Sequence, residues 1–128
     1  MIMNELPCIY ALQTTSGKGR GNGLGIPTIN FRIPNTISIP YGIYAGYLIV
    51  EKKKFKAAIH FGPRPQFEET DPSLEAYILE GKVSINSINL QLEFIKYIRV
   101  IRSFSTVNEM LQRIEVDIKE VEEILNTT

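Results

Sequence analysis

The chain has 128 residues, with 14 basic and 14 acidic side chains, so its formal net charge is zero. General adhesion to nucleic acid or to an anionic membrane depends on a basic excess, and the composition gives no reason to expect either. Because Cys8 is the only cysteine and His60 the only histidine, an internal disulfide, a multi-cysteine metal site and a two-histidine metal motif are excluded.

Six segments rich in β-branched and aromatic residues are distributed along the chain before residue 104. Turn-forming sequences such as Pro40-Tyr-Gly42 and Asp71-Pro72-Ser73 separate them, so we expect short antiparallel strands. The basic run Lys52-Lys-Lys54 lies between two of them and is expected to form a solvated hairpin tip rather than a nucleic-acid patch. The expected strands are Cys8–Gln13, Thr28–Arg32, Ile43–Val50, Phe55–Phe61, Leu74–Leu79 and Ile88–Ile98.

From Val107 onward the apolar residues recur every three or four positions, which is the pattern of an amphipathic helix. Thr106-Val-Asn-Glu109 is a capping box, in which the Thr106 hydroxyl accepts a hydrogen bond from a first-turn amide. We expect one domain over residues 1–128, with a barrel at about 7–104 and a helix at about 106–126. The fold is then mainly β, a small antiparallel barrel with the helix packed on it or plugging one end.

Glycine alternates with other residues from Ser16 to Gly25, at positions 17, 19, 21, 23 and 25. Such a backbone can approach a ligand closely and form an anion-binding concavity, to which Lys18 and Arg20 add positive charge. Neither the Walker pattern nor the dinucleotide-binding pattern fits the spacing of these glycines. The run is therefore either a phosphate loop or a flexible hairpin loop.

Two candidate sites follow from alternation along strands. Thr28 and Asn30 stand two residues apart, so both point to one face, and their oxygens suit Mg²⁺ as needed for phosphoryl transfer. Glu75 shares a face with Tyr77 in an otherwise apolar strand, where it is either a general base or an exposed carboxylate. His60 lies in the strand-like sequence Ala-Ala-Ile-His-Phe and is expected to be structural rather than catalytic.

Five motifs in order resemble those of the riboflavin kinase (flavokinase) family, and together they span about residues 10–125. The first is the glycine run with its Pro-Thr-Ile-Asn continuation, in which Ile29 replaces the alanine usual in that family. The five motifs are Gly17-Lys-Gly-Arg-Gly…Leu24-Gly-Ile-Pro-Thr-Ile-Asn-Phe31, Pro40-Tyr-Gly-Ile-Tyr44, Phe61-Gly-Pro-Arg-Pro65, Leu74-Glu-Ala-Tyr-Ile78, and Tyr97-Ile-Arg99…Phe104-Ser followed by a helix with Ile114…Asp117.

This resemblance implies a six-stranded Greek-key barrel and transfer of the ATP γ-phosphate to the ribityl 5′-hydroxyl of riboflavin, giving FMN and ADP. It implies that Thr28 and Asn30 hold Mg²⁺ and the phosphates, and that Glu75 is the general base. Flavin contacts are expected from Arg99, Phe104 and Leu111. The nucleotide-binding flap would comprise Gly17, Lys18, Gly19, Arg20, Gly21, Gly25, Pro27 and Thr28.

Two alternatives remain on a small barrel of this kind. The first is a non-catalytic flavin or nucleotide sensor, because Asn86-Ser87 and Val100-Ile101 depart from the family pattern. The second is an oligonucleotide-binding barrel, which would need a more basic face than this chain has.

The single histidine excludes the histidine-rich motif of the FAD-forming domain that accompanies this module in many bacteria, so we expect no FAD synthesis. With no signal peptide and no apolar run near ~20 residues, a cytoplasmic monomer is expected.

Overall fold

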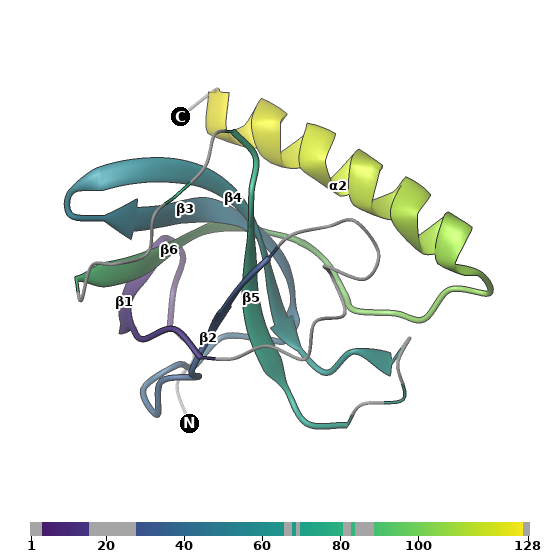
Figure 1. Cartoon of the computed structure of the whole chain (residues 1–128), viewed down its shortest axis with the longest axis horizontal. Coiled ribbons are helices and arrows are strands. Elements are labelled where there is room, and N and C mark those ends of the chain that lie inside the picture. The colour runs from purple at the N-terminus through teal and green to yellow at the C-terminus, as the bar shows by residue number, and fades with distance from the viewer. Residues whose placement is uncertain are drawn as a thin grey trace.

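The computed structural model describes residues 4–15, 28–65, 68, 70–80, 83 and 89–126 of the chain. In this part of the chain, six strands are followed by one long helix (Figure 1). The strands and the helix occur where the sequence predicted them, with ends that differ by at most two residues. Their bounds are β1 Cys8–Leu12, β2 Ile29–Phe31, β3 Gly42–Val50, β4 Lys53–Gly62, β5 Ser73–Ile78, β6 Leu90–Arg99 and α2 Val107–Asn126.

The β3–β4 hairpin shows why β4 starts earlier than predicted. Only Glu51 and Lys52 form the turn, and both have positive φ values, 48° and 74°. Positive φ at both central residues produces a two-residue turn whose twist matches that of the flanking strands. Lys53 therefore already pairs with Val50 as part of β4. The predicted solvated tip is confirmed, because all of residues 51–54 are exposed.

The six strands form one antiparallel sheet in the order β1-β6-β3-β4-β5-β2. Three consecutive strands, β3 to β5, form a meander, and β6 returns to lie beside β3, which is the Greek-key arrangement. The sheet curls strongly in Figure 1. At one end a bridge between Thr14 and Phe31 joins the segment after β1 to β2, and the Thr15 amide donates to the Asn30 carbonyl at 2.9 Å. The two edge strands thus meet, and the sheet forms a partly closed barrel.

The two faces of the sheet pack against different partners. Inward-facing side chains, including the fully buried Tyr44, Leu48, Ile59 and Phe94, fill the barrel. Tyr44 is held there by edge-to-face contact with Phe94, at 5.2 Å between ring centroids, and by a 2.6 Å hydrogen bond to the Pro40 carbonyl. Alternating residues face outward, toward α2. The helix therefore packs on the outside of the barrel and does not plug its end.

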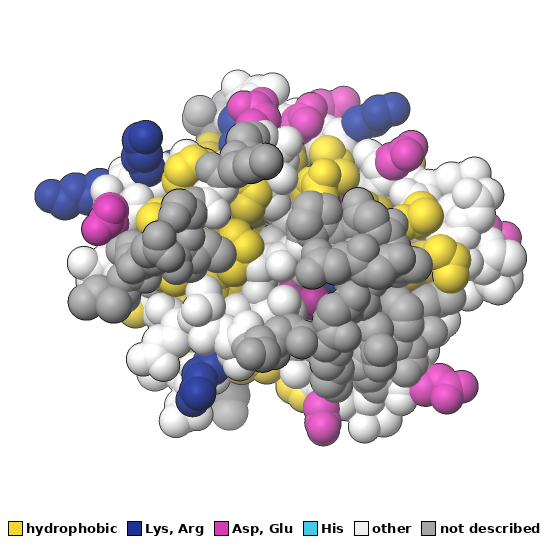
Figure 2. Space-filling view, in the orientation of Figure 1, with side chains coloured by type: hydrophobic (Ala, Val, Ile, Leu, Met, Phe, Trp, Pro, Cys, Tyr) yellow, Lys and Arg dark blue, Asp and Glu magenta, His cyan; other side chains and the backbone are white. Residues whose placement is uncertain are grey.

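Helix α2 lies across β3 and β4 and is anchored most firmly near its C-terminus, where Val121 and Leu125 pack against Ala45 (Figure 1). Its start is the predicted cap, in which the Glu109 amide donates to the Thr106 hydroxyl at 3.1 Å. Acidic side chains line its outer edge, and hydrophobic ones gather beneath it (Figure 2). Within the described residues, no helix is both long and apolar enough to cross a membrane.

Candidate active site

Three residues predicted to be functional, Asn30, Glu75 and Arg99, lie in one row across the outer face of the sheet. Asn30 of β2 is paired with Glu75 of β5, and Glu75 is paired with His60 of β4. His60 is paired with Ile43 of β3, which is paired with Arg99 of β6. Cross-strand partners point to the same face of a sheet, here the face that α2 covers. Five strands thus bring together side chains that are far apart in the sequence.

Glu75 is the centre of this row and is buried, with only 6% of its surface exposed. The Thr28 hydroxyl donates to its Oε1 atom at 3.3 Å, and the Arg64 guanidinium donates to its Oε2 atom in a close ion pair. These partners compensate for the hydration that a buried carboxylate loses. Of the two interpretations of Glu75 from the sequence, an exposed carboxylate is wrong. Arg64, which the sequence motif contained but to which no role was assigned, is its principal partner.

His60 is half-buried beside this pair. Its Nε2 atom lies 2.8 Å from the Gly62 carbonyl oxygen, so Nε2 carries the proton, because a carbonyl oxygen can only accept. Burial and, to a smaller extent, the nearby charge of Arg64 together lower the pKa of His60 to about 3, against a smaller opposing effect of the Gly62 carbonyl. The imidazole is therefore neutral near pH 7.

We expect the free energy of unfolding to decrease as the pH falls from about 6.5 toward 5. His60 takes up a proton in the unfolded chain near its ordinary pKa of 6.5 but not in the folded protein, so acid favours unfolding. The slope should approach about 1.4 kcal/mol per pH unit. Urea unfolding at several pH values measures it, and His60→Asn should remove most of it because the chain has one histidine. An unchanged slope in that variant would assign the pH dependence to other groups.

A cavity of about 110 Å³ lies between this row and α2. Thr28, His60, Arg64 and Glu75 contribute polar groups to its lining, and Tyr77 contributes an aromatic ring. Most of the remaining lining is apolar, so the cavity combines a few convergent polar groups with an apolar surface, as small-molecule sites do. The apolar lining residues are Ile43, Ala58, Ile59, Pro65, Ile101, Phe104, Met110, Ile114 and Ile118.

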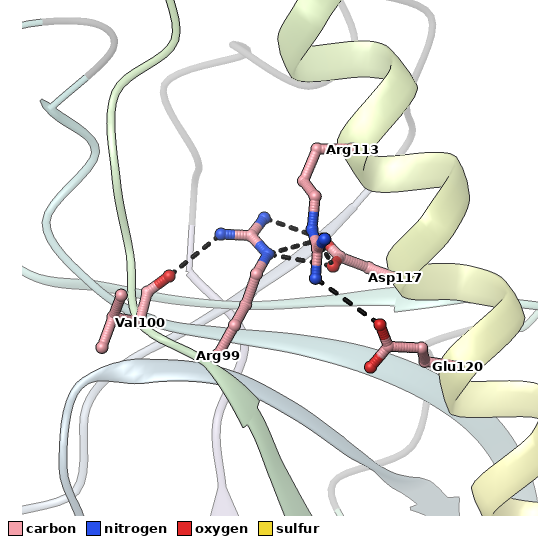
Figure 3. A network of polar contacts seen from close by, with 5 residues as sticks. All are labelled: Arg99, Val100, Arg113, Asp117 and Glu120. Atoms are coloured by element: carbon pink, nitrogen blue, oxygen red, sulfur yellow. Dashed lines mark hydrogen bonds and ion pairs between the residues drawn. The ribbon is translucent and has the colours of Figure 1, made fainter.

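On the helix side of the cavity, Asp117 of α2 joins two arginines (Figure 3). Arg99 donates to both carboxylate oxygens of Asp117, at 2.7–3.1 Å, and also to the Val100 carbonyl at 3.0 Å. Arg113, one turn earlier on α2, donates to Oδ1 at 3.1 Å and reaches Glu120 at 3.5 Å. Asp117 is only 3% exposed. The network fixes the end of β6 to the middle of the helix.

The three predicted flavin contacts are placed differently from one another. Arg99 and Phe104 line the cavity, with the Arg99 guanidinium carbon 5.8 Å from the Phe104 ring centroid. Leu111 is half-buried on α2 but is not among the described residues that line the cavity. Met110 and Ile114 line it instead, because positions four apart share a helix face whereas a neighbouring position is rotated by about 100°.

The predicted nucleotide flap cannot be placed in the same way. Of its residues, only Thr28 belongs to the part of the chain that the structure describes. Asn86-Ser87, which motivated the sensor alternative, also falls outside that part. The flap residues outside the described ranges are Gly17, Lys18, Gly19, Arg20, Gly21, Gly25 and Pro27.

Thr28 and Asn30 fit the oxygen chemistry of a small hard cation. The Thr28 hydroxyl directs its proton toward Glu75, so its lone pairs can face a metal ion, and the Asn30 amide lies opposite Glu75 in the register. Mg²⁺ usually takes only one or two protein oxygens, with water and substrate phosphates as its other ligands. Among the described residues, no cluster of three or more His, Cys, Asp or Glu forms a metal cage. A cation shared with a phosphate substrate is the kind this donor pair suits.

Comparison with known proteins connects this geometry to one family. The family model for riboflavin kinase (Flavokinase) matches residues 7–125. A riboflavin kinase of Homo sapiens is 30% identical over 132 aligned positions, covering 96% of this chain and 84% of that protein. A bifunctional riboflavin kinase/FMN adenylyltransferase of Bacillus subtilis is 29% identical over 108 residues, covering 81% of this chain. The chain spans only 34% of the length of that bifunctional relative.

The fold has a counterpart among solved structures. A crystal structure described as a macrolide-efflux protein from Streptococcus pneumoniae matches with a TM-score of 0.77. The match covers 91% of this chain and 38% of that chain, at 20% sequence identity. At this identity the likeness shows the fold alone.

Proposed function

The chain belongs to the riboflavin kinase family, and we propose that it transfers the γ-phosphate of ATP to the ribityl 5′-hydroxyl of riboflavin, giving FMN and ADP. One observation carries the proposal beyond family membership. Glu75 is a buried carboxylate in the wall of a largely apolar cavity, held beside the Thr28 hydroxyl. This combination suits an acceptor that presents an alcohol to Glu75 and an aromatic ring to the apolar lining.

In the proposed reaction, the 5′-oxygen forms a bond to the γ-phosphorus as the bond to the β–γ bridging oxygen breaks. The proton of the attacking hydroxyl passes to the Glu75 carboxylate, which acts as general base. Phosphoryl transfer otherwise depends on positioning and on neutralising phosphate charge, so a single base is enough. The charge that develops on the phosphates would be neutralised by bound Mg²⁺.

Thr28 and Asn30 would hold that cation and, through it, the phosphates. The Thr28 hydroxyl is oriented by its hydrogen bond to Glu75, so the base and the phosphate end of the site are coupled directly. The flap from Gly17 to Pro27 precedes Thr28 in the chain and is proposed to cover the nucleotide. Its alternating glycines allow close approach of backbone amides to the phosphates.

The cavity of about 110 Å³ between the sheet and α2 is too small for a whole flavin, so we propose that it receives one end of the ring system. The apolar lining and the rings of Tyr77 and Phe104 suit the flat dimethylbenzene end of that ring system. The Arg99 guanidinium is already hydrogen-bonded to Asp117 and to the Val100 carbonyl. Arg99 would therefore contribute to flavin binding mainly by packing against the Phe104 ring and holding it in place.

Incubating the chain with riboflavin, ATP and Mg²⁺ and separating the flavins by chromatography tests the proposal. An FMN peak that disappears without ATP, or when EDTA is added, would support it. Riboflavin binding without any FMN would contradict it and favour the sensor module. Absence of both binding and turnover would show that the ligand class is wrong.

Asn30→Ala should raise the Mg²⁺-ATP concentration needed for half-maximal FMN formation by about 10- to 100-fold, the usual cost of disturbing a metal site. Riboflavin affinity, measured by quenching of flavin fluorescence, should change little, because Asn30 does not line the described cavity. Asn35→Ala is a matched control, since Asn35 is exposed in the turn after β2. Equal losses for both substrates would indicate damage to the barrel and not to a metal site.

A further inference from the structure

Resting on the proposed kinase function, we propose that Arg64 is a positioning residue that holds the Glu75 carboxylate in its reactive orientation. The Nε and Nη2 groups of Arg64 both approach Oε2 of Glu75. The other oxygen, Oε1, accepts the hydrogen bond from the Thr28 hydroxyl. Thr28 and Glu75 both line the cavity. Arg64 thus fixes one carboxylate oxygen and leaves the other facing the phosphate-binding side.

The chain around Arg64 places its side chain there. Gly62 ends β4 with a φ of 137°, and a Cβ at this position would lie 2.4 Å from the Ile101 side chain. The chain therefore bends sharply where only glycine is accommodated. Pro63 and Pro65 then restrict the backbone on either side of Arg64, because each proline fixes its own φ and the second also limits the residue before it. The restricted backbone from Gly62 to Pro65 therefore holds the Arg64 guanidinium beside Glu75.

Burial makes this contact strong. Only 19% of the Arg64 side chain and 8% of the Glu75 side chain are exposed, so water competes weakly for either partner. A guanidinium also presents its donors in a rigid plane, which sets the direction of the carboxylate as well as its position. The weaker 3.3 Å bond from Thr28 would not by itself hold Glu75 in one rotamer. Arg64 is therefore the contact that orients the base.

The consequence is measurable as a split between kcat and KM. Arg64→Met should lower kcat for FMN formation by about 10- to 100-fold, while KM for riboflavin changes less than about threefold. Arg64→Lys should retain more of kcat than Arg64→Met, because it keeps a charged donor but lacks the planar fork. Arg32→Met is the matched control, since Arg32 is exposed on the segment after β2, and it should behave as wild type.

A double-mutant cycle with Glu75→Gln shows whether Arg64 acts through Glu75. In the Glu75→Gln background, Arg64→Met should change kcat by less than about twofold, because the group it positions no longer accepts a proton. The same loss in both backgrounds would overturn the proposal and place Arg64 in direct contact with substrate. Equal kcat for Arg64→Lys and Arg64→Met would also overturn it.

The experiments distinguish failure of the Arg64 proposal from failure of the proposed kinase function. Absence of FMN from the wild-type protein would refute the function, and the same four proteins would then be compared by thermal unfolding. Non-additive shifts in unfolding temperature would still support the positioning of Glu75 by Arg64. Additive shifts would overturn it. If Arg64→Met does not fold, the cycle is built with Arg64→Lys.

Discussion

Glu75→Gln should lower kcat for FMN formation by about 10²–10⁴-fold, which is the usual contribution of a general base. Glutamine has the shape of glutamate, and its single amide oxygen can accept from Arg64 while its NH2 group donates to the Thr28 hydroxyl, so the cavity wall should persist. Its amide cannot take up the proton of the attacking hydroxyl near neutral pH. Single-turnover FMN formation measures the chemical step, and quenching of flavin fluorescence measures riboflavin affinity, which should change little.

Glu93→Gln is the matched control for this experiment. Glu93 is also a glutamate that pairs with a basic side chain, Lys54 at 3.0 Å, but it does not line the described cavity. Its replacement should leave kcat near the wild-type value. Wild-type turnover in Glu75→Gln would remove Glu75 from the role of base, whereas a parallel loss of riboflavin affinity would assign it to binding.

Asp117→Ala should lower the free energy of unfolding by about 3–5 kcal/mol, the cost of removing one partner from a buried ion pair. Asp117 neutralises Arg99 and also Arg113, and 13% of the Arg99 side chain is exposed (Figure 3). A loss of this size is a large part of the ~5–15 kcal/mol that stabilises a typical domain. Urea unfolding followed by circular dichroism measures the change.

Glu120→Ala provides the comparison within the same network. Its carboxylate lies 3.5 Å from Arg113, but its side chain is 42% exposed, so its removal should cost less than about 1 kcal/mol. Similar losses for Asp117→Ala and Glu120→Ala would show that burial does not set the strength of these contacts. The Arg99–Asp117 pair would then not be what holds the end of β6 to the helix.

Alternation and helical spacing were sufficient to predict most of the fold. They placed Glu75 and Tyr77 on one face of their strand, and both line the cavity, whereas Leu74 and Ala76 between and beside them lie in the core. They also predicted the helix and the Thr106 cap. Both patterns depend on residues close together in sequence, which is where local stereochemistry acts most directly.

The partners of the site residues could not be predicted in this way. The contact of Arg64 with Glu75 depends on the register between β4 and β5 and on the backbone bend at Gly62. The contact of Arg99 with Asp117 depends on where α2 crosses the sheet. Neither contact can be predicted from the alternation of a strand or the spacing of a helix. A useful signal for Arg64 was present, since an arginine between two prolines at a strand end has little freedom to turn away.

The alternation of β5 also bears on how a newly made chain avoids misfolding. A slip of this strand by one residue against β4 would turn Glu75 into the apolar interior and expose Leu74 and Ala76 to the α2 side. An unpaired carboxylate in that interior is too costly for such a barrel to persist. The misregistered conformer is therefore much less stable than the native one. Glu75, the residue proposed for the chemistry, thus also favours the correct pairing of β5 with β4.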